Sequence, residues 1–202
     1  GTPVILFNRA TNEPNVSAVC ADNLAGGRLA ADVLLDSRHQ RPGFVAGLQD
    51  TSTSQDRERG FIVRLRERGC TRVQRAQGHY TYESGYAAAT DLLERDEPPD
   101  ALFCANDIMA LGAIDAIRAH GLRVGQDISV IGFDDIPMAA WGAYQLTTIS
   151  QEVDTMIQRT IALMLDRIEK PDAPARIEHV SGRLILRTSV RGLTPTVNEN
   201  GR

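Results

Sequence analysis

Polar side chains recur where the expected strands of this 202-residue chain end. The set comprises Asn8 after PVILF, Arg57 beyond GFVAG, Tyr80 after the next strand, Asn106 after ALFCA and Asp134 after VIGF. Asp and Asn exchange hydrogen bonds with hydroxyl groups, Arg offers a planar fork to adjacent oxygens, and Tyr packs on the apolar face of a ring. Such groups suit a hydroxyl-rich ligand held in a crevice, and they describe binding without a reacting centre.

Each of these residues alone also has a purely structural explanation. Asn106 or Asp107 would cap the helix that follows, and Asp134 would shape a turn. Asp134 and Asp135 could instead form a general acid and base pair, or bind Mg2+. Adjacent residues of an extended segment point in opposite directions, so the two carboxylates are poorly placed to share one substrate or ion.

The sequence lacks the motifs of common catalytic centres. Its four histidines are scattered, and none has the HExxH spacing of a metal site. No GxSxG, GxxxxGK[ST] or GxGxxG motif occurs. A hydrolase or a nucleotide-using enzyme is therefore unsupported, and we expect neither enzymatic activity nor a cofactor or metal.

Composition limits the partners and the compartment. The net charge of −4 provides no general attraction to nucleic acid. Cys20, Cys70 and Cys104 have no CxxC spacing, which favours buried thiols in a reducing cytosol over a zinc site or a disulfide framework. No apolar run approaches the roughly 20 residues that span a bilayer. We expect a cytoplasmic protein without a membrane partner, although a mature periplasmic protein would look the same.

Apolar runs alternate with amphipathic stretches along most of the chain. Strands are expected at residues 3–7, 16–20, 43–47, 72–76, 101–105 and 128–131, and helical patterns follow most of them. This alternation predicts right-handed βαβ units and a parallel sheet flanked by helices. An irregular segment at 133–148 precedes an amphipathic helix at about 153–168 and a final strand at 183–187.

Several long motifs resemble one family. The runs CANDIMALGAIDAIRAHGLRVGQDISVIGFDDIP and LTTISQ, with DNLAGGRLAADVLL upstream and R-x-x-G-F at 57–61, resemble the effector-binding core of LacI-type transcriptional repressors. The resemblance extends from Pro3 to about Val190. It implies an α/β fold of the periplasmic-binding-protein-like type I, with two lobes joined by three crossovers and a ligand in the cleft between them.

The resemblance also implies a division of the chain, with one lobe complete and the other partial. Residues 1–15 and 152–180 would form a partial N-terminal lobe, 16–148 and 183–191 the C-terminal lobe, and 192–202 a flexible tail. The segment 133–148 would be one crossover that absorbs lobe rotation. Its Trp141 is either a packing residue or a ligand contact.

The effector site follows from matching positions. The contacts would be Asn8, Arg57, Tyr80, Asn106, Asp134 and Gln151. Asn8 stands where many sugar-binding members of the family carry an acid, so the resemblance indicates a sugar or a similar small polar ligand without choosing among them.

Family likeness further implies the partners. A homodimer would form through surfaces of the C-terminal lobe, and operator DNA would be bound only through a helix-turn-helix domain that these residues do not contain. The alternative is a sugar-binding protein of a transport system with the same fold. An operator-reading domain or an export signal in the parent gene would separate the two.

Overall fold

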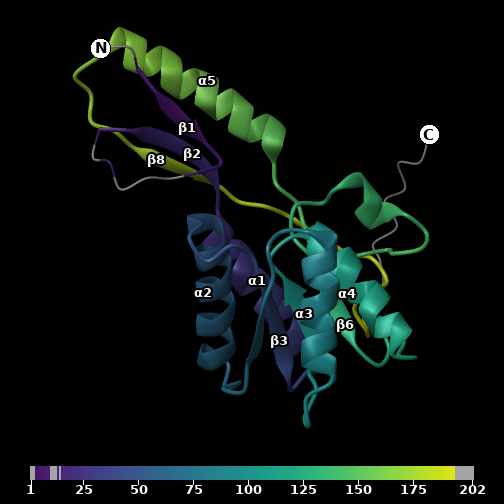
Figure 1. Ribbon diagram of the computed structural model, residues 1–202. Coiled ribbons are helices and arrows are strands. Elements are labelled where there is room, and N and C mark those ends of the chain that lie inside the picture. Colours follow the sequence, from purple (N-terminus) through teal and green to yellow (C-terminus); the bar gives the residue numbers. More distant parts are fainter. Residues whose placement is uncertain (1–2, 10–12, 14, 194–202) are drawn as a thin grey trace.

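The computed structural model describes residues 3–9, 13 and 15–193, which form two units around two parallel sheets (Figure 1). The larger sheet has the strand order β4-β3-β5-β6, and all of its pairs are parallel. Its strands are β3 (Pro42–Ala46), β4 (Gln74–Gln77), β5 (Ala101–Cys104) and β6 (Ser129–Ile131). Its helices are α1 (Asn23–Asp36), α2 (Ser52–Glu67), α3 (Tyr82–Leu93) and α4 (Asp107–Ala119). Helix α1 packs beside α2, and α3 packs beside α4, on opposite sides of the sheet (Figure 1).

The small unit combines three short parallel strands with one long helix. Its strands are β1 (Ile5–Phe7), β2 (Ser17–Ala21) and β8 (Ile177–Val180), and its helix is α5 (Val153–Glu169). Met156 and Leu163 of α5 are buried together with Val19 and Val180 of the sheet. The chain passes between the units three times: after β2, before α5 and after β8 (Figure 1).

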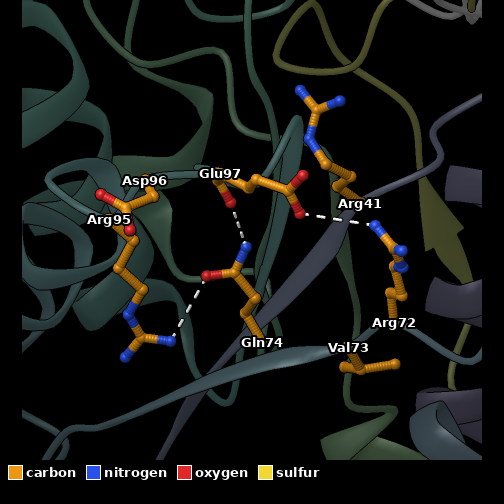
Figure 2. Close-up of a pocket in the computed structure, with 7 residues that line it drawn as sticks. All are labelled: Arg41, Arg72, Val73, Gln74, Arg95, Asp96 and Glu97. Carbon is orange, nitrogen blue, oxygen red and sulfur yellow. Dashed lines mark hydrogen bonds and ion pairs between the residues drawn. The ribbon is translucent and has the colours of Figure 1, made fainter.

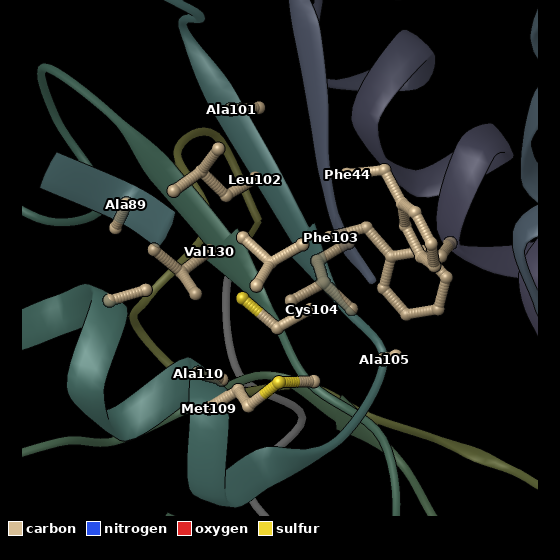
Figure 3. Packing of buried hydrophobic residues seen from close by; sticks show 14 of the residues in the cluster. Phe44, Ala89, Ala101, Leu102, Phe103, Cys104, Ala105, Met109, Ala110 and Val130 are labelled. Atoms are coloured by element: carbon tan, nitrogen blue, oxygen red, sulfur yellow. The ribbon is translucent and has the colours of Figure 1, made fainter. Parts of the chain in front are cut away.

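The core of the large unit is centred on three phenylalanines. Phe44 of β3, Phe61 of α2 and Phe103 of β5 are completely buried, with ring centroids 5.1 to 5.9 Å apart and tilted planes. Figure 3 shows Phe44 beside Phe103, with Met109 of α4 lining the same region. Tilted aromatic pairs add stabilisation beyond the burial of their area. This packing fixes β3 and β5 relative to the helix that carries Arg57.

Helices α1 and α2 approach so closely that only glycine fits at two positions. A Cβ atom on Gly27 would lie 2.1 Å from the carbonyl oxygen of Arg57, and one on Gly60 would lie 2.1 Å from that of Leu24. Real Cβ atoms cannot come so near to backbone oxygens. The two glycines therefore bring the first turns of α1 against the middle of α2, where the functional residues lie.

The expected α/β architecture, with parallel sheets flanked by helices, is confirmed, but one domain boundary is wrong. Residues 16–20 were assigned to the complete lobe, whereas β2 pairs with β1 on one side and β8 on the other. Local periodicity identifies a strand without specifying which sheet it joins. Strand β4 also begins two residues later than expected, at Gln74. Most of the expected flexible tail, residues 194–202, lies outside the described residues.

The segment 133–148 is not a crossing between the units. Parallel bridges from Ile131 to Thr147 and from Asp134 to Ser150 hold both of its ends beside β6. The short helix η1 (Pro137–Ala140) lies within it, and the strand β7 (Thr148–Ile149) follows and pairs antiparallel with β9 (Leu184–Ile185). The chain crosses afterwards, between Ser150 and Val153. We call residues 133–147 the β6–β7 connection.

Burial on α5 predicts unequal effects of two alanine substitutions. Leu163 is 1% exposed and Ile161 is 56% exposed. Leu163→Ala is expected to lower the free energy of unfolding by about 2–5 kcal/mol, because it leaves a cavity against the small sheet. Ile161→Ala, the matched control, should change it by less than about 0.5 kcal/mol. Urea unfolding followed by circular dichroism measures both, and equal losses would contradict the assignment of the buried face.

Candidate functional site

Arg57 is buried beneath the carboxyl ends of the large sheet. It is 3% exposed, and its Nε donates a hydrogen bond to Asn23 Oδ1 at 2.8 Å. One terminal nitrogen donates to the carbonyl oxygen of Ala105, and the other lies 3.4 Å from Asp134 Oδ1. The guanidinium plane covers the ring of Phe133, 3.6 Å from its centroid. One side chain thus joins α1, α2, the end of β5 and the β6–β7 connection.

Burial determines the electrostatics of this ion pair. Burial lowers the pKa of Arg57, and the nearby charge of Asp134 acts in the opposite direction. Burial likewise raises the pKa of Asp134, against the lowering effects of the Arg57 charge and of a hydrogen bond from Gln151. Guanidinium groups remain protonated in proteins. The pair therefore consists of a buried cation and a carboxylate that needs it to remain ionised.

Asp134 also reaches a small cavity at the boundary of the two units. Gln151 donates a hydrogen bond from Nε2 to Asp134 Oδ1 at 2.5 Å, and the backbone N–H of Asp134 donates to Ile149 at 2.8 Å. A cavity of about 270 Å3 is lined by both side chains and by Glu152, Asp154 and Arg183, among others. Its lining is rich in carboxylate, amide and guanidinium groups, which suits a polar, hydroxyl-bearing molecule.

The other expected contacts lie at neighbouring strand ends. Tyr80 follows β4 with a left-handed backbone (φ 63°), and its ring lies so close to Gly47 that a Cβ there would be 2.2 Å away. Its hydroxyl lies 3.3 Å from that of Thr51. Asn106 follows β5 and caps α4, accepting a hydrogen bond from the Met109 N–H at 3.0 Å. The capping role considered for Asn106 is thus present.

Asn8 ends β1 in the small unit. Its backbone N–H donates to Val19 at 2.8 Å, and its Oδ1 is buried without a hydrogen-bond partner in the described structure. Only some of the six expected residues therefore contact one another. Arg57, Asp134 and Gln151 form one chain of contacts, whereas no hydrogen bond of the described residues joins the side chains of Asn8, Tyr80 or Asn106 to that chain.

Two residues of the site, Asn23 and Phe133, are not among the contacts predicted from the sequence. Asn23 is the first residue of α1, and Asp22 caps this helix by accepting a hydrogen bond from the Ala25 N–H at 3.0 Å. Asn23 instead accepts from Arg57 and donates to the carbonyl of Ala21. Phe133 stacks under the guanidinium. The only available signal was their place at strand ends, which does not separate them from ordinary turn residues.

A larger cavity lies elsewhere, at the amino ends of the strands (Figure 2). It has a volume of about 680 Å3, and Arg41, Arg72 and Arg95 contribute to its lining. Arg72 pairs with Glu97 at 3.4 Å, and Arg95 donates to Gln74 at 3.3 Å (Figure 2). None of the six expected residues lines it, so we place the candidate site at the cavity beside Asp134.

Among the described residues, none of the helices has the length and apolar character that a bilayer-spanning segment needs. In the same part of the chain, no cluster of three or more His, Cys, Asp or Glu side chains has a geometry that would hold a metal ion.

Comparison with known proteins identifies the class that this fold and site define. Residues 31–190 match the model of the periplasmic binding protein-like domain. The probable HTH-type transcriptional repressor ExuR of Bacillus subtilis is 32% identical over 95% of the chain, and the HTH-type transcriptional repressor PurR of Pectobacterium carotovorum is 36% identical over 93%. The chain spans 58% and 56% of the lengths of these two relatives.

Solved structures agree. A LacI transcriptional regulator from a Rhodococcus species superposes with a TM-score of 0.88 at 30% identity, covering 94% of this chain and 70% of that one. A LacI family regulator from Enterococcus faecium with bound ribose gives 0.84 at 27% identity, covering 95% and 72%. The chain therefore belongs to the periplasmic binding protein-like family, in the branch formed by LacI-type transcriptional regulators.

The buried ion pair predicts a large loss of stability when its cation is removed. Arg57→Met should lower the free energy of unfolding by about 3–5 kcal/mol, because Asp134 and Asn23 lose their partner inside the protein. Adding Asp134→Asn to this variant should recover part of the loss. Arg59→Met on the same helix, whose side chain is 66% exposed, is the control and should cost less than about 1 kcal/mol. Urea unfolding provides the comparison, and a similar cost at both positions would refute the buried pair.

Proposed function

We propose that the chain is the effector-binding domain of a LacI-type transcriptional regulator. A sugar or a similar small polar ligand binds between the two units and controls operator binding by a helix-turn-helix domain outside these residues. The observation that carries the proposal is the chain of contacts from Arg57 through Asp134 to Gln151 at a polar cavity beside the boundary of the units.

The six expected residues take different roles in this proposal. Asp134 and Gln151 contact ligand hydroxyls directly, because both line the cavity. Arg57 is too deeply buried to offer a ligand much contact surface. Its role is to orient Asp134. Tyr80 and Asn106 complete the surface offered by the large unit. Asn8 contributes from the small unit, where its unpartnered Oδ1 would accept a hydrogen bond from a ligand.

The two units are the two lobes of this domain, with a boundary revised by β2. Residues 3–9, 15–21 and 153–180 belong to the small lobe, and residues 22–150 and 183–191 belong to the large one. A ligand that contacts both lobes favours one relative orientation, and it shifts the equilibrium only by its difference in affinity for the two states. The segments that cross between the lobes then absorb the rotation.

The same fold also serves sugar-binding proteins of transport systems. The likeness to repressors covers 93–95% of this chain in the relatives described above, which favours the regulator. These relatives are repressors by name rather than enzymes, and we propose that this domain likewise catalyses no reaction. A regulator of transcription would act in the cytoplasm.

We further propose that the large lobe pairs with a second copy of the chain. Trp141 in the β6–β7 connection is 57% exposed, more than the other large apolar side chains of that lobe. Tryptophan is enriched among residues that dominate binding energy at protein interfaces. The backbone N–H of Tyr144 donates to the carbonyl oxygen of Trp141, and the hydroxyls of Tyr144 and Tyr82 both donate to Asp115 of α4. These bonds fix the segment that carries Trp141.

Ligand binding is tested by a thermal-shift screen of this chain against pentoses, hexoses, their phosphates and purines. D-Ribose is expected to raise the melting temperature, because a ligand of the native state stabilises it by mass action, about 2.7 kcal/mol at a hundredfold excess over Kd. Asp134→Asn should abolish the shift, and Asp91→Asn on the exposed face of α3 should preserve it. A panel without any stabilising compound, or a shift retained by Asp134→Asn, would refute the proposed site.

Self-association is tested by sedimentation velocity over a range of concentrations. The unaltered chain is expected to form a dimer as concentration rises, and Trp141→Asp should remain monomeric because a carboxylate would be buried at the interface. Val63→Asp, at a position that is 40% exposed on α2, is the control and should dimerise normally. A strictly monomeric parent chain would count against the dimer.

A further inference from the structure

The carboxylate of Asp107, the first residue of α4, is completely buried, and within the described part of the chain it takes part in no ion pair. Its Oδ1 accepts a hydrogen bond from the Thr148 hydroxyl at 2.6 Å, and its Oδ2 accepts one from the Ile136 N–H at 2.9 Å. Its own backbone N–H donates to Phe133 at 2.8 Å. One residue of α4 thus holds the β6–β7 connection near its start and, through Thr148, just beyond its end.

The end of β6 is shaped around this carboxylate. A Cβ atom on Gly132 would lie 2.0 Å from Asp107 Oδ1, so only glycine admits the carboxylate at this position. A residue whose only role was to begin a helix would need no such space. The close approach indicates that the position of the Asp107 side chain is itself constrained.

The turn that Asp107 holds is strained. Asp134 and Asp135 have φ angles of 118° and 56°, in the region that favours glycine. Such non-glycine conformations are unfavourable and persist only where surrounding contacts enforce them. The bond from Ile136 to Asp107 fixes the residue directly after this pair, and the ion pair of Asp135 with Arg187 at 2.8 Å holds the other side.

Several charged or titratable groups face Asp107. The pKa of Asp107 is raised to about 6: burial is the largest cause, the hydrogen bonds from Thr148 and Ile136 act in the lowering direction, and the charges of Asp134 and Asp135 act in the raising direction. The two cations nearby are engaged elsewhere, since Arg57 pairs with Asp134 and Arg187 pairs with Asp135. The thiol of Cys104, on β5, is also buried near Asp107. Burial is the main cause of the raised pKa of Cys104, and the charge of Asp107 is the second cause.

Both charge states of Asp107 can keep its hydrogen bonds. When Oδ1 is protonated, it donates to the Thr148 oxygen, because a hydroxyl can accept as well as donate. Oδ2 continues to accept from Ile136. Protonation also removes the repulsion from Asp134 and Asp135 and the cost of a buried charge without a cation. Burial and this repulsion outweigh the hydrogen bonds from Thr148 and Ile136, which favour the ionised form. The neutral form therefore holds the connection more firmly than the ionised form.

We propose that Asp107 is a proton-sensitive positioning residue, which holds the β6–β7 connection and its cavity-facing Asp134 more tightly when neutral than when ionised. The role of Asp134 in ligand binding rests on the proposed function. The contacts by which Asp107 holds the β6–β7 connection, which we call the Asp107 latch, do not depend on any ligand. The sign follows from the raised pKa. A group that binds its proton more tightly in the folded state adds stability at acidic pH, and this stability is lost as the pH rises through about 6.

Trp141 offers a direct readout, because it is the single tryptophan of the chain and lies in the β6–β7 connection. Acrylamide quenching of its fluorescence is measured from pH 4.5 to 8, without ligand and at one protein concentration. The unaltered chain should show a transition with a midpoint near pH 6, with stronger quenching on the alkaline side. Asp107→Asn, which resembles the neutral form, should lack the transition and keep the weak quenching of the acidic state at every pH.

Three further variants make the test specific. Thr148→Val removes a bond that favours the ionised form, so the midpoint should rise, an effect that loss of packing alone would not produce. Asp127→Asn on the surface serves as the carboxylate control, and His120→Gln serves as a control because histidine ordinarily titrates in this range. Both should keep the original midpoint, and circular dichroism verifies that each variant is folded.

The proposal is overturned if the unaltered chain shows no transition between pH 4.5 and 8, or if Asp107→Asn titrates like the parent. If Asp107→Asn fails to fold, the Thr148→Val midpoint decides: a rise supports the latch, and an unchanged midpoint refutes it. Since no ligand enters the measurement, a ligand panel without any stabilising compound would refute the proposed site and leave this result standing.

Discussion

A charged guanidinium enclosed under the strand ends constrains the whole large lobe. Arg57 needs hydrogen-bond acceptors in place of water, because an unpaired buried charge is prohibitively costly. Asn23, Ala105 and Asp134 supply them from three different elements, and Phe133 covers the plane of the group. The ends of β5 and β6 and the start of α1 must therefore converge on one point of α2, and Gly27 and Gly60 let the helices come near enough.

The same arrangement prepares the cavity before any ligand arrives. Asp134 already has a cation behind it, an amide beside it and a backbone bond to Ile149. A ligand that meets such a surface need not pay for ordering it, which is the general benefit of preorganisation. The left-handed backbone of Asp134 and Asp135 is part of the cost of that preparation. In the proposed site Arg57 acts through Asp134, although its residue type alone suggests a direct ligand contact.

Local sequence patterns predicted the elements better than their partners. Buried parallel strands are nearly continuous apolar runs, so GFVA and ALFC were recognisable, and their order implied a parallel sheet. The sheet that β2 joins depends on hydrogen bonds to residues 5–7 and 177–180, which no local pattern encodes. The same limit applies to the site. Polar residues at strand ends and the capping by Asn106 are local features that the sequence predicts, but the burial of Arg57 depends on contacts with distant segments.

The two lobes differ in how their stability is built, and this difference bears on how a ligand would act. The large sheet is covered on both sides and contains the phenylalanine core, whereas the small sheet packs against α5 with only a few buried side chains. Ile157, Ile161 and Leu165 of α5 remain 44 to 56% exposed. Regions with few buried apolar contacts open at lower free energy. A ligand bridging Asp134 and Asn8 would therefore increase the stability of the small lobe proportionally more than that of the large lobe. Ligand binding between the lobes would then chiefly order β1, β2, β8 and α5.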